Sequence, residues 1–151
     1  MKQEHYYEVS VQWEKERKGT MRSPVLHSQI EVVTPPEFPN GIAGLWSPEH
    51  LFVGAINSCL MTTFLAIAEN SKLNFSEFDS KAIGKLEMVD GKYMISEVTL
   101  MPFLTIEDEQ QQDRAGRVLQ KAEANCLITN SIKSKIIFNP TIKIVNAEAA
   151  L

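Results

Sequence analysis

Cysteine is scarce in this chain. Its two cysteines, Cys59 and Cys126, lie 67 positions apart, which fits no zinc motif such as Cys-x-x-Cys, and its three histidines, His5, His27 and His50, are scattered. We therefore expect no metal site and no bound cofactor. In a reducing compartment, such a pair is either two unrelated buried thiols or a catalytic dithiol, and the local sequence has to distinguish them.

Clusters of positive charge and an apolar leader are also missing. The 15 Lys and Arg residues against 19 Asp and Glu residues give a net charge of −4 and a pI near 5.4, which argues against a nucleic-acid partner. The N-terminal residues contain no apolar run of the kind that secretory signals carry. With 151 residues, 44% of them hydrophobic, the sequence predicts one soluble, cytoplasmic domain over residues 1–151.

The longest uncharged stretch, Leu51 to Ala68, predicts a helix. Ser47 stands at the N-cap position, Pro48 follows where a missing N–H is harmless, and Glu49 places negative charge at the positive end of the helix dipole. The apolar side chains cover every helical direction, so this helix needs protein on all sides. Because the rest of so short a chain cannot enclose it, we predict a homodimer.

Near its middle, this helix changes character. Gly54, Asn57 and Ser58 are poor core material, but small and polar side chains suit a reactive group that a substrate must approach. Cys59 follows them directly. An isolated buried cysteine is more often a small core residue than a nucleophile. The same polar residues, in a run of borderline length, argue against a membrane span.

The N-terminal segments predict extended structure. Residues 6–13 and 20–33 are rich in residues that favour strands, and the charged residues 15–19 between them predict a hairpin turn. Residues 34–44 contain three prolines and two glycines, so we expect an irregular loop leading into the buried helix.

The C-terminal half predicts a second hairpin and a second helix. Strands over residues 78–88 and 92–101 are separated by Asp90-Gly91, the dipeptide favoured in type I′ turns. Thr105 and Asp108 then resemble a capping box for an amphipathic helix that reaches about Asn125.

A short helical turn over residues 127–133 and an edge strand over residues 136–145, interrupted at Asn139-Pro140, complete the chain. The predicted order is β-β-α-β-β-α-β, an α+β fold with antiparallel sheets built from hairpins and without βαβ crossovers.

Several of these features together carry a family resemblance. They are the blocks Trp46–Phe52 and Ala122–Ser131, the small residues before Cys59 and the Asp90-Gly91 hairpin. In this order, from about Val9 to Val145, the chain resembles the OsmC/Ohr superfamily of osmotically induced and organic hydroperoxide resistance proteins. The resemblance implies an antioxidant, thiol-dependent peroxidase of the stress response. It also implies an intertwined homodimer with two active sites at the subunit interface, acting on organic hydroperoxides and recycled by a dithiol or lipoyl-type reductant.

The resemblance also implies roles for single residues. Cys59 matches the cysteine that attacks the peroxide, and Cys126 the resolving cysteine that closes a disulfide with it. Glu49 falls at the family's glutamate position. In the hydroperoxide-resistance branch the site arginine lies in an Arg-x-Gly turn, which Arg17 fits, with Arg22 as a second candidate. In the other branch the arginine shortly precedes the buried helix, where this chain has none.

Glu49 and Cys59 are ten residues apart, and ten helical residues span about 15 Å. One continuous helix therefore cannot bring them into contact. Glu49 would serve the Cys59 of the partner chain, or the helix would have to break. Four aromatic residues are candidate walls of an apolar substrate pocket: Phe38, Trp46, Phe52 and Phe64.

Two other functions stay open at this point. One is a domain of the same fold that binds a small apolar ligand without turnover, which requires Cys59 and Cys126 to lie too far apart to bridge, or Cys59 to lack a nearby arginine. The other is an alkylation or acyl-transfer enzyme, which would use Cys59 without needing Cys126.

Overall fold

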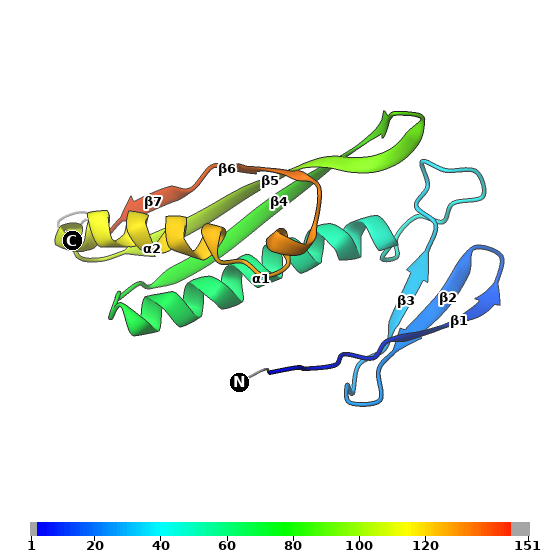
Figure 1. Cartoon of the computed structure of the whole chain (residues 1–151), viewed down its shortest axis with the longest axis horizontal. Helices are drawn as coiled ribbons and strands as arrows, with labels where there is room; N and C mark the ends of the chain where they lie inside the picture. The colour runs from blue at the N-terminus through cyan, green and yellow to red at the C-terminus, as the bar shows by residue number, and fades with distance from the viewer. Residues whose placement is uncertain (1–2, 146–151) are drawn as a thin grey trace. The chain divides into compact units, whose positions relative to one another are not determined.

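The computed structural model describes residues 3–145, and the chain divides into two units, residues 1–51 and 52–151. The first unit is a three-stranded antiparallel sheet followed by a loop and the first turn of a helix (Figure 1). Its strands lie in the order β1 (Ser10–Lys15), β2 (Lys18–Arg22) and β3 (Ile30–Val33). The predicted hairpin turn between the first two strands is confirmed.

The expected second extended run over residues 20–33 is wrong in one respect. This segment belongs to two strands instead of one. The chain turns back after β2, where the backbone N–H of Leu26 donates to the carbonyl of Ser23 at 3.2 Å. Pro24, which has no N–H to offer a sheet, stands inside this turn. As a result β2 pairs with both of its neighbours in the sequence.

The long helix α1 (Pro48–Asn70) begins where the sequence predicts. The hydroxyl of Ser47 accepts a hydrogen bond from the backbone N–H of His50 at 3.2 Å, which is the expected N-cap contact. The residues from 34 to 45 form no strand or helix, in agreement with the predicted loop.

The second unit is built on a long hairpin of β4 (Glu77–Val89) and β5 (Lys92–Ile106). Asp90 and Gly91 join the strands with positive φ angles of 49° and 79°, so the predicted turn is confirmed. Strand β5 continues past residue 101, and Thr105 therefore belongs to the strand instead of capping a helix.

The cap of the next helical segment is Asp108. Its carboxylate accepts a hydrogen bond from the backbone N–H of Gln110 at 2.9 Å. A short 3₁₀ turn, η1 (Glu109–Gln111), then leads into α2 (Gln112–Ala124). The amphipathic helix exists as predicted, but it starts later because the strand before it is longer.

After α2 and a second 3₁₀ turn, η2 (Thr129–Ser131), the chain adds two short strands beside β5. These are β6 (Lys135–Phe138) and β7 (Thr141–Ile144), and both run parallel to β5. Pro140 separates them, since it cannot donate to the ladder. The prediction of purely antiparallel sheets without crossovers is wrong, because the path through α2 returns the chain in the direction of β5. The fold is α+β with one antiparallel and one mixed sheet, and the described residues form seven strands instead of five.

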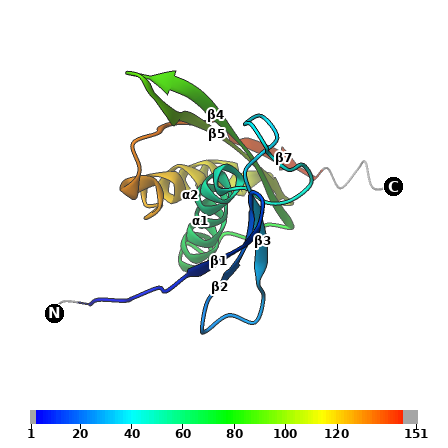
Figure 2. The same ribbon diagram turned by 90° about the vertical axis from the view of Figure 1, so that its right-hand side faces the viewer.

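The core of the second unit lies between the mixed sheet and the two helices, which cover one face of that sheet (Figure 2). From α1 come Ile56, Leu60, Phe64 and Ala68, and the ring of Phe64 stacks on Phe78 with centroids 4.6 Å apart. This layer holds the middle of α1 against β5 and α2.

In a single chain, α1 is not buried on all sides. Its fully buried residues form one stripe, whereas Met61 and Leu65 on another face are 40% and 42% exposed. The helix has the length and hydropathy of a membrane span, but its buried stripe packs as a core helix does. The apolar surface outside that stripe is what a partner chain would cover.

Two glycine substitutions, one in the hairpin turn and one in α2 as a control, test the assigned turn. Gly91→Ala should lower the free energy of unfolding by about 1–2 kcal/mol, because a Cβ is unfavourable at a φ of +79° although no atom lies within 4 Å of it. Gly116→Ala in α2 also meets nothing within 4 Å and should instead raise that free energy by about 0.5–1 kcal/mol. Urea unfolding followed by circular dichroism measures both. Equal effects of one sign would contradict the assigned turn.

Candidate functional site

The second unit brings the two cysteines together. Cys59 lies in the middle of α1, and Cys126 lies two residues after the end of α2. Both thiols are free and buried, with 8% and 1% of the residue exposed, and they lie close enough to shift each other's pKa. The packing of α1 against α2 thus joins residues that are 67 positions apart in the sequence.

Cys126 begins a tight turn that faces Cys59. The backbone N–H of Asn130 donates to the carbonyl of Cys126 at 3.1 Å, which closes one helical turn. The first N–H groups of such a turn have no partner within it. Those of Leu127 and Ile128 lower the pKa of Cys59. The turn therefore presents two backbone donors to a thiol on the neighbouring helix.

The pKa of Cys59 is lowered from its ordinary value. Burial is the largest single influence and acts in the opposite direction, because it penalises the thiolate. The hydrogen bonds from Ile128, Cys126, Thr63 and Leu127 together outweigh it. The local donors therefore favour ionisation of this cysteine.

Cys126 has the opposite tendency. Burial, again the largest influence, raises its pKa, and the neighbouring Cys59 raises it further. The hydroxyl and backbone N–H of Thr129 lower it, but not enough to reverse the shift. The two thiols are thus asymmetric. The pKa shift of Cys59 favours its thiolate, and the shift of Cys126 favours its protonated thiol.

Neither the donors nor this asymmetry follow from the sequence. The backbone N–H groups of Leu127 and Ile128 carry no side-chain signal at all. Thr63 has a weak one, because it stands four residues after Cys59 and such pairs share a helical face. Its hydroxyl oxygen lies 3.8 Å from the Cys59 sulfur.

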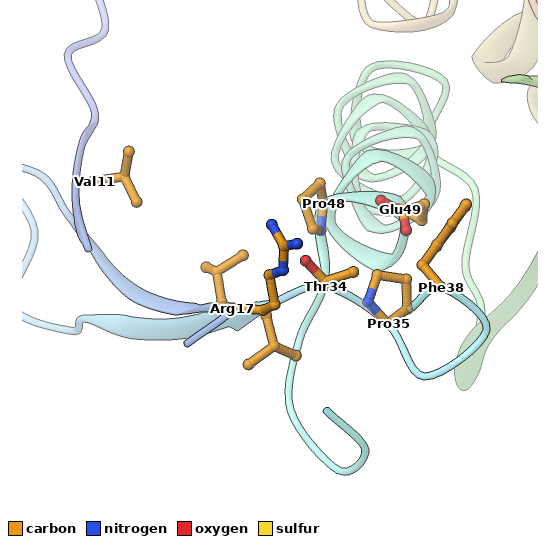
Figure 3. A pocket seen from close by; sticks show the side chains of 9 residues that line it. Val11, Arg17, Thr34, Pro35, Phe38, Pro48 and Glu49 are labelled. Atoms are coloured by element: carbon orange, nitrogen blue, oxygen red, sulfur yellow. The ribbon is translucent and has the colours of Figure 1, made fainter. Parts of the chain in front are cut away.

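A cavity of about 290 Å³ in the first unit contains three of the other predicted site residues (Figure 3). Arg17, in the turn between β1 and β2, and Glu49, in the first turn of α1, both line it, and Phe38 contributes an aromatic wall. One carboxylate oxygen of Glu49 is buried and has no hydrogen-bond partner among the described residues. Arg17 is exposed at the edge.

The second arginine candidate is engaged elsewhere. The side chain of Arg22 donates to the side-chain carbonyl of Gln29 at 2.9 Å and to that of Gln12 at 3.5 Å. It does not belong to the residues that line the cavity. Of the two arginines, Arg17 is therefore the one that shares a cavity with Glu49.

The remaining aromatic candidates lie apart from that cavity. Trp46 is 55% exposed and meets the ring of His50 edge-on at 6.3 Å. Phe52 is half-buried against the core, and Phe64 is completely buried within it. Phe64 is positioned to support the helix that carries Cys59.

The predicted residues are thus divided between the two units. Cys59 and Cys126 belong to the second, whereas Arg17, Glu49 and Phe38 belong to the first. Helix α1 is unbroken from Pro48 to Asn70, so about 15 Å of helix separates Glu49 from Cys59 of the same chain. The alternative of a break in this helix is removed.

Comparisons with known proteins agree with this fold. The family model described as OsmC-like protein matches residues 41–141. The uncharacterized protein YmaD of Bacillus subtilis is 22% identical over 138 residues, covering 88% of this chain and 90% of that protein.

Two solved structures are similar over almost their whole length. An OsmC-like protein of unknown function from Vibrio cholerae matches with a TM-score of 0.80 at 22% identity, covering 91% of this chain and 99% of that one. An organic hydroperoxide resistance protein from Elizabethkingia anophelis, solved with thiocyanate bound, matches with a TM-score of 0.75 at 18% identity, covering 96% and 100%. At these identities the similarity shows a shared fold.

Alkylation should reveal the asymmetry of the two thiols. We expect iodoacetamide at neutral pH to modify Cys59 before Cys126, because the thiolate is the reactive form. The rate at Cys59 should fall as the pH drops through a midpoint below the ordinary cysteine value near 8.5. The midpoint for Cys126 should lie above that value. Peptide mass spectrometry across a pH series measures both, and coinciding midpoints would refute the asymmetry.

Proposed function

Because the chain belongs to the OsmC-like protein family, we propose that it is a thiol-dependent peroxidase that reduces organic hydroperoxides through Cys59 and Cys126. The observation that carries this proposal is the closeness of two free, buried thiols that influence each other and whose pKa values are shifted in opposite directions. A peroxidase of this type needs one ready thiolate and one neighbouring thiol in reserve. The organic hydroperoxide resistance protein of the same fold supports the choice of substrate class.

In the first step, the Cys59 thiolate attacks the distal oxygen of the hydroperoxide. A sulfur–oxygen bond forms as the oxygen–oxygen bond breaks, and the alkoxide takes up a proton and leaves as an alcohol. The sulfur is oxidised by two electrons to a sulfenic acid. The backbone N–H groups of Leu127 and Ile128 favour the anion that begins this step.

In the second step, Cys126 attacks the sulfenic sulfur of Cys59. A disulfide forms, and the hydroxyl group of the sulfenic acid leaves with the Cys126 proton as water. The raised pKa of Cys126 keeps its thiol protonated until this moment. A dithiol or lipoyl-type reductant then restores both thiols and becomes a disulfide itself.

The ligand-binding alternative requires thiols that are too far apart to bridge, or a Cys59 without a nearby arginine. The mutual influence of the two thiols on their pKa values speaks against the first condition, and in the proposed dimer Arg17 of the partner chain removes the second. An enzyme that uses Cys59 alone would not need a second thiol whose proton is directed at the first. The paired arrangement therefore favours a redox cycle over either alternative.

We further propose that the enzyme is a homodimer in which Arg17 and Glu49 of one chain serve Cys59 of the other. The buried oxygen of Glu49 has no partner in the part of the chain that the structure describes and is free to accept a hydrogen bond from the guanidinium of Arg17, which lines the same cavity. An oriented arginine remains charged in a semi-buried site and would favour the partner's thiolate. Phe38 and the other apolar side chains of this cavity suit an organic substituent. Trp46, Phe52 and Phe64 stay candidates for the substrate-binding surface.

Cysteine substitutions separate the two thiol roles. Cys59→Ser should abolish the consumption of cumene hydroperoxide. Cys126→Ser should allow one reduction per chain, leave a sulfenic acid on Cys59 that over-oxidises, and slow turnover with dithiols. A coupled assay and intact mass after one equivalent of peroxide measure these outcomes. Retained activity in Cys59→Ser would refute the proposed function.

A mixed dimer tests the assignment of Arg17. Light scattering should first report twice the chain mass. Arg17→Leu and Cys59→Ser chains, each nearly inactive alone, are then co-expressed with different tags. If Arg17 acts across the interface, each heterodimer regains one complete site and about half of the wild-type activity per dimer. If Arg17 acts within its own chain, the heterodimer stays as inactive as its parents, and the assignment fails.

A further inference from the structure

Two neighbouring threonines on α1 use their hydroxyls differently. The hydroxyl of Thr62 donates to the backbone carbonyl of Cys59 at 3.2 Å. The hydroxyl of Thr63 instead lies 3.8 Å from the Cys59 sulfur. Thr62 is exposed, whereas Thr63 is half-buried. The two side chains are chemically identical, but only the second reaches the thiol.

The Thr63 hydroxyl completes a set of donors around one sulfur. The backbone N–H groups of Leu127 and Ile128 and the thiol of Cys126 reach this sulfur from the turn after α2. Thr63 approaches it from α1 itself, one helical turn beyond Cys59. The sulfur of a thiolate accepts hydrogen bonds more strongly than that of a thiol, so each donor favours the anion.

These donors differ in whether a side-chain substitution can remove them. Two are backbone groups, and the third, Cys126, is itself consumed when the disulfide forms. Among the described residues, Thr63 is thus the side-chain donor to Cys59 that persists through the redox cycle. A hydroxyl can also rotate, so it is able to follow the sulfur as the charge on it changes.

We propose that Thr63 is a thiolate-stabilising residue, whose hydroxyl donates to the Cys59 sulfur and sets how much of this cysteine is ionised at neutral pH. Because the contact lies entirely within the second unit, it does not depend on Arg17. For its effect on peroxide turnover this proposal rests on the proposed function. Its effect on the thiol can be measured without peroxide.

The test uses Thr63→Val, which keeps the shape and removes the hydroxyl. The matched control is Thr62→Val, which makes the same change one residue away. Thr63→Ser retains a hydroxyl, and Thr63→Ala serves if the valine variant does not fold. Each variant is alkylated with iodoacetamide across a pH series, and the Cys59 peptide is quantified by mass spectrometry.

We expect Cys59 in Thr63→Val to react about three- to tenfold more slowly than wild type at pH 7 and below, since a lost hydrogen bond to an anion is worth a change of this order. At a pH high enough to ionise both proteins fully, the two rates should converge. Thr63→Ser and Thr62→Val should follow the wild-type curve. An unchanged curve for Thr63→Val, or an equal shift in Thr62→Val, would overturn the proposal.

A parallel measurement separates this proposal from the function on which it rests. The kcat/KM for cumene hydroperoxide in Thr63→Val should fall by the same factor as alkylation and converge with wild type at the same high pH. If no variant consumes peroxide but the alkylation curve still shifts, the peroxidase proposal fails and the role of Thr63 stands. If peroxide is consumed and neither curve shifts, Thr63 has no such role.

Discussion

The rest of the structure depends on one constraint, which is that a sulfur anion inside a protein needs hydrogen-bond donors in place of water. Cys59 is buried in the middle of an apolar helix, and this burial by itself opposes ionisation. The turn that starts at Cys126 supplies two backbone N–H groups and a thiol to this sulfur. The lowered pKa of Cys59 therefore depends on the contact between α1 and the segment after α2.

The mixed sheet makes that contact possible. The path from β5 through α2 to β6 is a crossover that lays α2 on the same face as α1 and ends it close to the middle of that helix. Phe64, stacked on Phe78, holds α1 in register with the sheet.

The charged residues of the proposed site belong to the first unit. Arg17 and Glu49 share a cavity in which a carboxylate oxygen has no hydrogen-bond partner among the residues described, and a buried acceptor of this kind is costly unless a partner arrives. The large apolar surface of α1 that its own chain leaves exposed is likewise unfavourable in water. Among the described residues of one chain, this oxygen has no hydrogen-bond partner and this apolar surface stays exposed. In the proposed enzyme, hydrogen bonding within one unit and an arginine from the partner's other unit act on the same thiolate.

The sequence by itself determined the elements whose causes are local. Ser47 and Pro48 set the start of α1, Asp90-Gly91 set the hairpin, and the motif blocks indicated Cys59, Cys126 and the family. The extra strands depended on Pro24 and Pro140, whose interruptions a pattern of β-prone residues understates. The crossover and the donors from Leu127, Ile128 and Thr63 were decided only by tertiary structure. They result from backbone groups and long-range packing. Every residue except proline has the same backbone N–H, so only the fold decides which atom that N–H contacts.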